Sequence, residues 1–183
     1  MFEFQPNLLQ LDTLRLILDD NIEKVASFTG HRPESFEDYD EESDTIIGVK
    51  HKLYNQIKNA ISQGYAYFVG GGARGVDIWV GETVTELKKI YPHIKLVTII
   101  PHENQAKSWS QSWQNRYDNL MQNSDFVSVI SAGFSYASFH IRNRFLVDHS
   151  SLLIGVYNGT KGGTQSTIEY AQKQQKQIII IDC

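Results

Sequence analysis

A glycine-rich stretch at residues 70–77 contains the residue types that bind anions through the protein backbone. It reads GGGARGVD and follows the short apolar, β-prone run Tyr65–Val69. Beyond it, apolar residues recur at helical spacing up to Ile90, so the local order is strand, glycine loop, helix. Glycines let main-chain N–H groups approach a ligand closely. The first turn of a helix adds unpaired N–H donors and the positive end of a dipole, so a phosphate is the favoured anion.

Two side chains within this stretch could contribute to such a site. Arg74 could form a bidentate contact with a phosphate. Asp77 lies one turn into the helix, where its carboxylate could cap the helix or bind a ribose hydroxyl. The spacing matches neither the dinucleotide-binding fingerprint nor a P-loop. A tight turn that packs a helix against a sheet is therefore the alternative interpretation.

Composition limits the class of protein. The chain has 183 residues, of which 41% are hydrophobic and 21% are charged, as expected for a globular protein with one main domain. The net charge of −4 argues against a protein that mainly coats nucleic acid. The only cysteine is Cys183, the histidines lack metal-ligand spacing, and no apolar run is long enough to cross a bilayer. We therefore expect a cytoplasmic protein with no metal site and no membrane partner.

Short apolar runs alternate with helical patterns along most of the chain. Strands are expected at residues 24–28, 65–69, 95–100, 126–130, 152–157 and 177–181, the third of them stopped by Pro101. Helices are expected at residues 45–63, 76–90, 110–123 and 164–173, with a further helix after residue 139 that points Ile141 inward. This alternation predicts a three-layer, Rossmann-like α/β fold: a mostly parallel sheet of about six strands with helices on both faces.

Two N-terminal segments fall outside this alternation. Residues 1–22 are expected to form a helical extension, and residues 23–183 the Rossmann-like domain. The apolar face of the extension needs a partner, which is either the sheet or a second subunit. Its apolar residues are Leu8, Leu9, Leu11, Leu14, Ile17 and Leu18. The acidic run 37–44 is expected to be a solvated loop, with Ser43 or Asp44 as N-cap of the next helix.

The topology of a parallel α/β sheet places every loop that follows a strand at the same edge. This edge would gather residues 29–33, 70–77, 101–105, 132–142 and 158–164. Ligands of open α/β sheets bind there, so we expect an anion or nucleotide site. The aromatic residues Trp109, Trp113 and Tyr117 flank one of these loops and either stack on a base or, as helical spacing favours, belong to the core. Trp79 is expected in the core.

These motifs resemble those of the SLOG superfamily, which joins the DNA-processing protein DprA with the LOG phosphoribohydrolases. The most similar group is the YpsA/YoqJ-like family of bacteria and their phages. The resemblance covers about residues 24–182 and rests on residues 29–33 (TGHRP), residues 70–77, the Asn143-Arg144 pair and residues 159–164 (GTKGGT). It implies a nucleotide-derived ligand bound by Thr29, Gly30, His31, Arg32, Gly70, Gly71, Gly72, Arg74, Gly75, Asp77, Gly162, Gly163 and Thr164.

The last glycine loop also resembles the Pro-Gly-Gly-x-Gly-Thr-x-x-Glu motif of LOG enzymes. Gly162, Gly163 and Glu169 match that motif, whereas the residues at 161, 165 and 166 differ from it. The resemblance implies that Glu169, with Arg142 on the preceding helix, would cleave the N-glycosidic bond of a nucleoside monophosphate. The alternative is that Glu169 is a surface residue and Arg142 a structural partner.

Three functions follow from these observations. The leading hypothesis is a protein, acting as a sensor, that binds a small nucleotide derivative of the ADP-ribose, NAD or nucleoside monophosphate type and forms a homo-oligomer. The second is a phosphoribohydrolase that uses Arg142 and Glu169. The third is single-stranded DNA binding by analogy to DprA, which the acidic net charge makes the least favoured.

Overall fold

The structure is a computed structural model that describes residues 7–36 and 39–183. These residues form a six-stranded sheet in the order β4-β3-β2-β1-β5-β6, in which every strand pair is parallel. The strands are β1 (Val25–Gly30), β2 (Tyr67–Gly70), β3 (Lys95–His102), β4 (Phe126–Ser131), β5 (Leu152–Tyr157) and β6 (Gln177–Asp182). The predicted fold class is confirmed.

The expectation that Pro101 stops the third strand was wrong. β3 continues through Pro101 to His102, which pairs with Ser131 of β4. β2 ends opposite Thr98, so the last part of β3 has a neighbouring strand on one side only. A proline is tolerated where one side of a strand has no ladder to complete.

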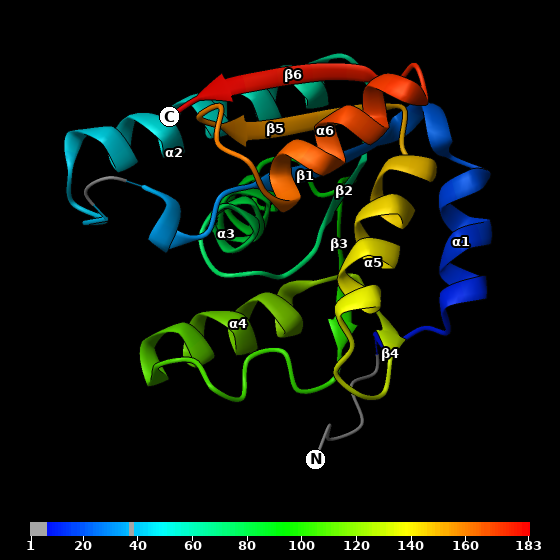
Figure 1. The fold of residues 1–183 in the computed structure, drawn as a ribbon. Coiled ribbons are helices and arrows are strands. Elements are labelled where there is room, and N and C mark those ends of the chain that lie inside the picture. The colour runs from blue at the N-terminus through cyan, green and yellow to red at the C-terminus, as the bar shows by residue number, and fades with distance from the viewer. Residues whose placement is uncertain (1–6, 37–38) are drawn as a thin grey trace.

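Helices cover both faces of the sheet (Figure 1). On one face lie α2 (Asp44–Ser62), α3 (Val76–Lys88) and α4 (Gln111–Asn123); on the other lie α1 (Leu11–Asp19), α5 (Tyr136–Asp148) and α6 (Gly163–Lys173). The four central strands β3, β2, β1 and β5 are almost wholly buried, as a parallel sheet covered on both sides requires, whereas the edge strands β4 and β6 are only partly buried. Within residues 7–36 and 39–183, no helix combines the length and the apolar character needed to span a membrane.

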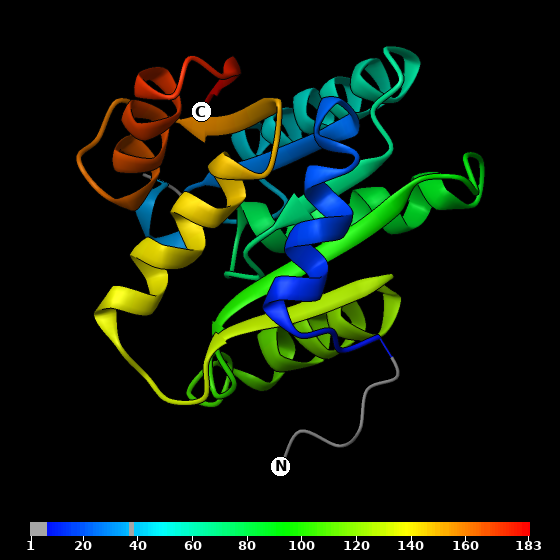
Figure 2. The same cartoon turned by 90° about the vertical axis from the view of Figure 1, so that its right-hand side faces the viewer.

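The N-terminal segment packs on the sheet. α1 lies across the strands beside α5 (Figure 2), and it buries Leu14 and Leu18 in the same core cluster as Val97 and Phe145. The expected apolar face is therefore covered by the sheet domain. Leu8 and Leu9 precede the helix and instead run along β4, where Leu9 N–H donates to the carbonyl of Val127 at 2.8 Å. Residues 1–6 of the predicted extension lie outside the described part of the chain.

Two apolar residues expected to point inward are exposed. Ile90 is 63% exposed because α3 ends at Lys88 and leaves it in the following turn. Ile141 is 51% exposed because α5 begins at Tyr136 and turns Arg142, Phe145 and Leu146 toward the protein interior. Trp79 is buried as predicted.

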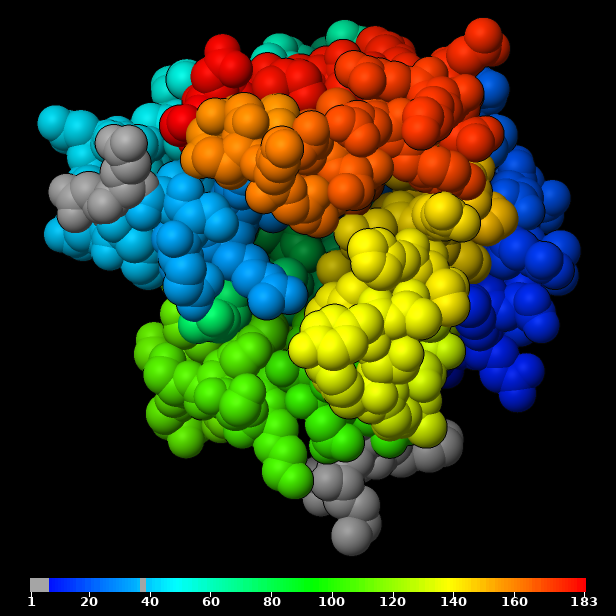
Figure 3. Space-filling model, viewed as in Figure 1, coloured from blue at the N-terminus to red at the C-terminus, as the bar shows by residue number. Residues whose placement is uncertain are grey.

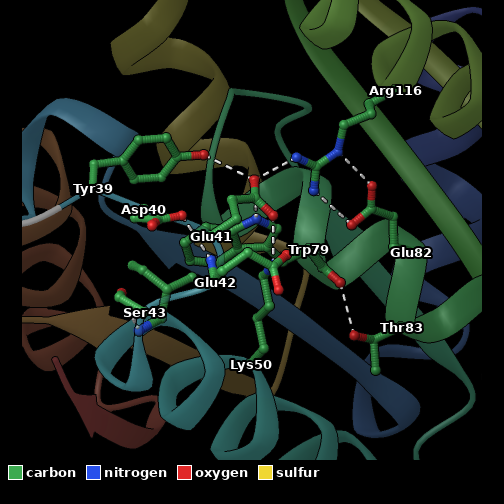
Figure 4. Close-up of polar contacts among 11 residues, drawn as sticks. Tyr39, Asp40, Glu41, Glu42, Ser43, Lys50, Trp79, Glu82, Thr83 and Arg116 are labelled. Atoms are coloured by element: carbon green, nitrogen blue, oxygen red, sulfur yellow. Dashed lines mark hydrogen bonds and ion pairs between the residues drawn. The ribbon is translucent and has the colours of Figure 1, made fainter.

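The acidic run is only partly solvated, which corrects the expectation of a solvated loop. Glu41 accepts hydrogen bonds from Tyr39 Oη at 2.8 Å and from Trp79 Nε1 at 3.3 Å (Figure 4). It also pairs with Lys50 of α2 and Arg116 of α4, so one carboxylate joins three helices. Ser43 caps α2 as predicted, accepting a bond from the Ile46 N–H. Residues 37 and 38 of the run lie outside the described residues.

This carboxylate makes stability depend on pH. Burial alone would raise the pKa of Glu41, but hydrogen bonds from Arg116, Lys50 and Tyr39 outweigh it and lower the pKa from 4.5 to about 2. A lowered carboxylate pKa stabilises the fold above its unfolded value, and this contribution is lost as pH falls through its folded value. We therefore expect Glu41→Gln to reduce the free energy of unfolding at neutral pH, with the deficit shrinking as pH falls from 4.5 toward 2.

Urea unfolding at several pH values measures this deficit. The control is Glu42→Gln, since Glu42 is the exposed neighbour of Glu41. A deficit that stays constant with pH, or one that Glu42→Gln reproduces, would contradict the assignment.

Candidate functional site

A cavity of about 530 Å³ opens at the carboxyl edge of the sheet. It lies at the ends of β1 and β5, neighbouring strands whose following helices pass to opposite faces of the sheet. This is the position where open α/β sheets bind ligands, and the volume suits a small organic molecule. Figure 3 shows the hollow between the segments near residues 30–36 (light blue), 134–145 (yellow) and 158–164 (orange).

The structure places most of the predicted site residues in the lining of this cavity and the others outside that lining. Residues that line it are Thr29, Gly30, His31, Arg32, Asp77, Arg142, Gly162, Gly163 and Thr164. Residues outside the lining are Gly70, Gly71, Gly72, Arg74, Gly75 and Glu169. The central glycine stretch therefore contributes to the cavity mainly through Ala73 and Asp77.

Arg142 is the most unusual residue of the cavity. It is only 6% exposed, and its Nη1 has no hydrogen-bond partner in the described part of the chain. Its Nε donates to Asn143 Oδ1 at 2.7 Å, and Nη1 lies 3.8 Å from Asp77 Oδ2, beyond hydrogen-bond distance. Burying a charged donor without a partner is costly, and Arg142 is one of the residues that line the cavity, so its guanidinium is a candidate to bind an anion there.

Asp77 balances the charge of Arg142 and fixes the loop beside it. Its Oδ2 accepts the Ala73 N–H at 3.0 Å. Burial raises the pKa of Asp77 and lowers the pKa of Arg142, and the charge of each opposes the shift of the other. The expected capping role of Asp77 is thus exerted on the glycine loop.

Gly71 makes room for the buried arginine. A Cβ built on Gly71 would lie 1.5 Å from Arg142 Nη1, so any side chain at this position would collide with the guanidinium. Gly72 adopts a φ of +66°, and its carbonyl accepts a 2.7 Å bond from Gln105 Nε2. These glycines shape the wall behind the cavity.

Arg74 faces away from the cavity. It pairs with Glu34, and its guanidinium carbon lies 5.8 Å from the centre of the Trp109 ring. Trp109 packs against Tyr117, and Trp113 against Tyr39. These aromatic residues lie outside the cavity lining and belong to the core and its rim, as helical spacing favoured.

His31 joins the two loops that meet at β1 and β5. Its Nε2 accepts the Asn158 N–H at 3.2 Å, and its ring stacks on Tyr157 with the centroids 5.7 Å apart. Burial lowers the pKa of His31, which favours the neutral ring that this acceptor role requires. His31 therefore holds the loop after β1 against the loop after β5.

Positive charge dominates the cavity although the chain is acidic overall. Arg32, Arg142 and Lys161 line it, whereas Asp77 is the single carboxylate among the described lining residues. The N-terminus of α6 also opens here, since Gly163 and Thr164 begin that helix and line the cavity. Within the residues that the structure describes, no cluster of His, Cys, Asp or Glu has the arrangement of a metal site.

Sequence reasoning missed several lining residues. They are Lys161, Asn143 and three aromatic residues of the segment after β4, Phe134, Tyr136 and Phe139. The topology rule had placed that segment at the correct edge. Its aromatic character alone gave no reason to choose it over the tryptophans near residue 110.

The two residues predicted to be catalytic line different cavities. Glu169 lines a smaller cavity of about 230 Å³ between α5 and α6, where it is exposed and accepts a 2.8 Å bond from Gln165 Nε2. Arg142 lines the larger cavity, and His140 and Asn143 border both. The structure therefore does not bring Arg142 and Glu169 together in one pocket.

The fold and this cavity define a Rossmann-like α/β protein with a crevice at the ends of β1 and β5. The chain belongs to the YpsA family, described as the YspA SLOG family, whose sequence model matches residues 26–182.

Relatives agree with this assignment, and solved structures share the fold. The chain is 29% identical over 157 residues to UPF0398 protein BH1768 of Halalkalibacterium halodurans, covering 84% of this chain and 83% of that protein. It is 32% identical over 142 residues to the SPbeta prophage-derived protein YoqJ of Bacillus subtilis, covering 70% of this chain and 83% of that protein. DNA processing protein A (DprA) from Helicobacter pylori has a TM-score of 0.62 at 22% identity, over 90% of this chain and 67% of that one. DprA from Streptococcus pneumoniae has a TM-score of 0.59 at 17% identity, over 87% of this chain and 50% of that one. The likeness to DprA shows a shared fold.

The close approach of Arg142 to Gly71 yields a matched pair of variants. Gly71→Ala would force the guanidinium to move, and we expect a loss of about 1–3 kcal/mol in the free energy of unfolding from overpacking. A Cβ on Gly70 meets nothing within 4 Å, and Gly70 has no positive φ. Gly70→Ala should therefore leave stability unchanged or raise it by about 0.4–1 kcal/mol. Urea unfolding of both variants measures the difference, and equal losses would show that Arg142 does not occupy this position.

Proposed function

We propose that this protein binds a phosphorylated ribose derivative of the nucleotide type in the cavity at the carboxyl edge of the sheet. One observation carries the proposal: Arg142, only 6% exposed and with an Nη1 donor that has no partner among the described residues, lines a cavity that Arg32 and Lys161 also line. An anion in this position would complete the hydrogen bonding of the guanidinium and would gain from weak solvent screening.

Each part of the lining has a role in this proposal. Arg142 and Arg32 donate to phosphate oxygens, and the first N–H groups of α6, from Gly163 and Thr164, donate to the same group. Asp77 keeps the Arg142 charge compensated before the ligand binds and offers its remaining lone pairs to a ribose hydroxyl. His31 maintains the spacing of the two loops.

Phosphoribohydrolase activity is a less favoured candidate. It requires a carboxylate at the glycosidic bond of a nucleotide whose phosphate is held by arginine. Glu169 lines the neighbouring cavity, and Asp77 is engaged with Ala73 and Arg142. We therefore favour binding without turnover, as in a sensor. Release of free base from a nucleoside monophosphate, abolished by Glu169→Ala, would instead support the enzyme.

Single-stranded DNA binding is the candidate suggested by the likeness to DprA. The H. pylori DprA structure is described in terms of its single-stranded DNA binding mode. An electrophoretic shift assay with a single-stranded oligonucleotide over a range of salt concentrations tests this function, because phosphate contacts make the affinity fall steeply with salt. Binding to DNA with no affinity for mononucleotides would replace the proposal.

Titration calorimetry with AMP, ADP-ribose and NAD tests the proposal directly. We expect the wild-type chain to bind at least one of these ligands. Arg32 is exposed, so Arg32→Ala should preserve the fold and weaken binding about tenfold or more by removing a charge-assisted hydrogen bond. Arg142→Lys keeps the buried charge but loses the planar fork, and we expect a loss of similar size.

Arg144→Ala is the matched control. Arg144 lies on the same helix as Arg142 but outside the larger cavity, with its guanidinium 5.3 Å from the Tyr170 ring centre. Its removal should leave affinity unchanged. No binding of any of the three ligands by folded protein, or equal losses in the Arg32 and Arg144 variants, would overturn the proposed function.

A further inference from the structure

Three aromatic side chains form one wall of the cavity. Phe134 and Tyr136 are 62% and 80% exposed, although aromatic rings of this size are usually at least partly covered. Together with Phe139 they line the same cavity as Arg142. We call these three residues the aromatic platform. Exposed rings that gather at a ligand cavity indicate a binding surface.

The platform is held in place before any ligand arrives. Phe134 packs edge-on against Tyr136, with the ring centroids 5.1 Å apart. The buried ring of His102, at the end of β3, packs edge-on against Phe134 at 5.4 Å and against Phe139 at 5.7 Å. The hydroxyl of Tyr136 is not needed for these contacts. Rings fixed in this way present contact area at little further cost in conformational entropy.

The platform adjoins the cationic part of the cavity. The guanidinium carbon of Arg32 lies 6.0 Å from the centre of the Phe139 ring, so a predicted phosphate-binding side chain touches the aromatic wall. An occupant that fills the cavity must therefore meet both positive charge and flat apolar rings. A nucleotide combines an anion with a planar heterocycle, whereas a sugar phosphate lacks the heterocycle.

We propose that the aromatic platform stacks on the base of the ligand and makes the site select nucleotides over sugar phosphates that lack a base. This inference rests on the proposed function and adds the residues that determine specificity. A protein partner docked on the platform would contact the exposed rings without needing the cationic side chains of the cavity. A mononucleotide uses both, and a cavity of about 530 Å³ is of a size that holds one.

Calorimetry with AMP and ribose 5-phosphate on the full chain tests the inference. We expect the wild-type chain to bind AMP about tenfold or more tightly than ribose 5-phosphate, which is the effect of stacking one base on aromatic side chains. The double variant Phe134→Ala/Tyr136→Ala should lose this preference while its affinity for ribose 5-phosphate stays the same. Tyr136→Phe should keep the preference, because the ring is retained.

Ile141→Ala is the control, since Ile141 is an exposed apolar residue of the same helix outside the lining. It should leave both affinities unchanged, and thermal unfolding verifies that each variant is folded. Equal weakening of AMP and ribose 5-phosphate in the double variant, or no change in either, would overturn the platform while leaving the proposed phosphate site in place. If the folded wild-type chain binds none of AMP, ADP-ribose, NAD and ribose 5-phosphate, the proposed function and the platform are contradicted together.

Discussion

The structure of the site depends on one buried charge. Arg142 comes from α5, yet its guanidinium rests against Gly71 at the end of β2 and faces Asp77 of α3. Such a charge needs compensation, because the cost of removing it from water is large. Asp77 supplies an opposite charge, Asn143 accepts one hydrogen bond, and the missing Cβ of Gly71 supplies the space. Among the described residues Nη1 still has no hydrogen-bond partner, and Arg142 lines the cavity.

Sheet topology accounts for the chemistry that surrounds this charge. The loop after β1 brings Arg32 and His31, and the loop after β5 brings Lys161 and the start of α6. The loop after β4 and the start of α5 bring the aromatic platform. The bond between His31 and Asn158 fixes the first two loops to each other. Segments distant in sequence therefore meet at one edge, with cations and aromatic rings on different parts of the same wall.

Periodicity predicted the architecture because buried parallel strands are continuous apolar runs, and residues 152–157 were placed without error. It failed where tertiary context decides: Pro101 stays in β3, Ile141 faces solvent, and Glu41 is drawn into an ion-pair cluster. For the site, the glycine-containing motifs predicted that Gly163 and Arg32 lie at the same edge of the sheet, and both line the cavity. The glycine motif does not show which way the Arg74 side chain turns, so Arg74 was expected at the cavity, whereas it pairs with Glu34.

A crystal structure of the protein with AMP is the most direct test of the central claim, that the Arg142 guanidinium binds the anion. The account predicts a phosphate oxygen within hydrogen-bond distance of the Arg142 guanidinium and close to the N–H groups of Gly163 and Thr164. A phosphate bound elsewhere, for example against Arg74, with Arg142 still bonded only to Asn143, would contradict it.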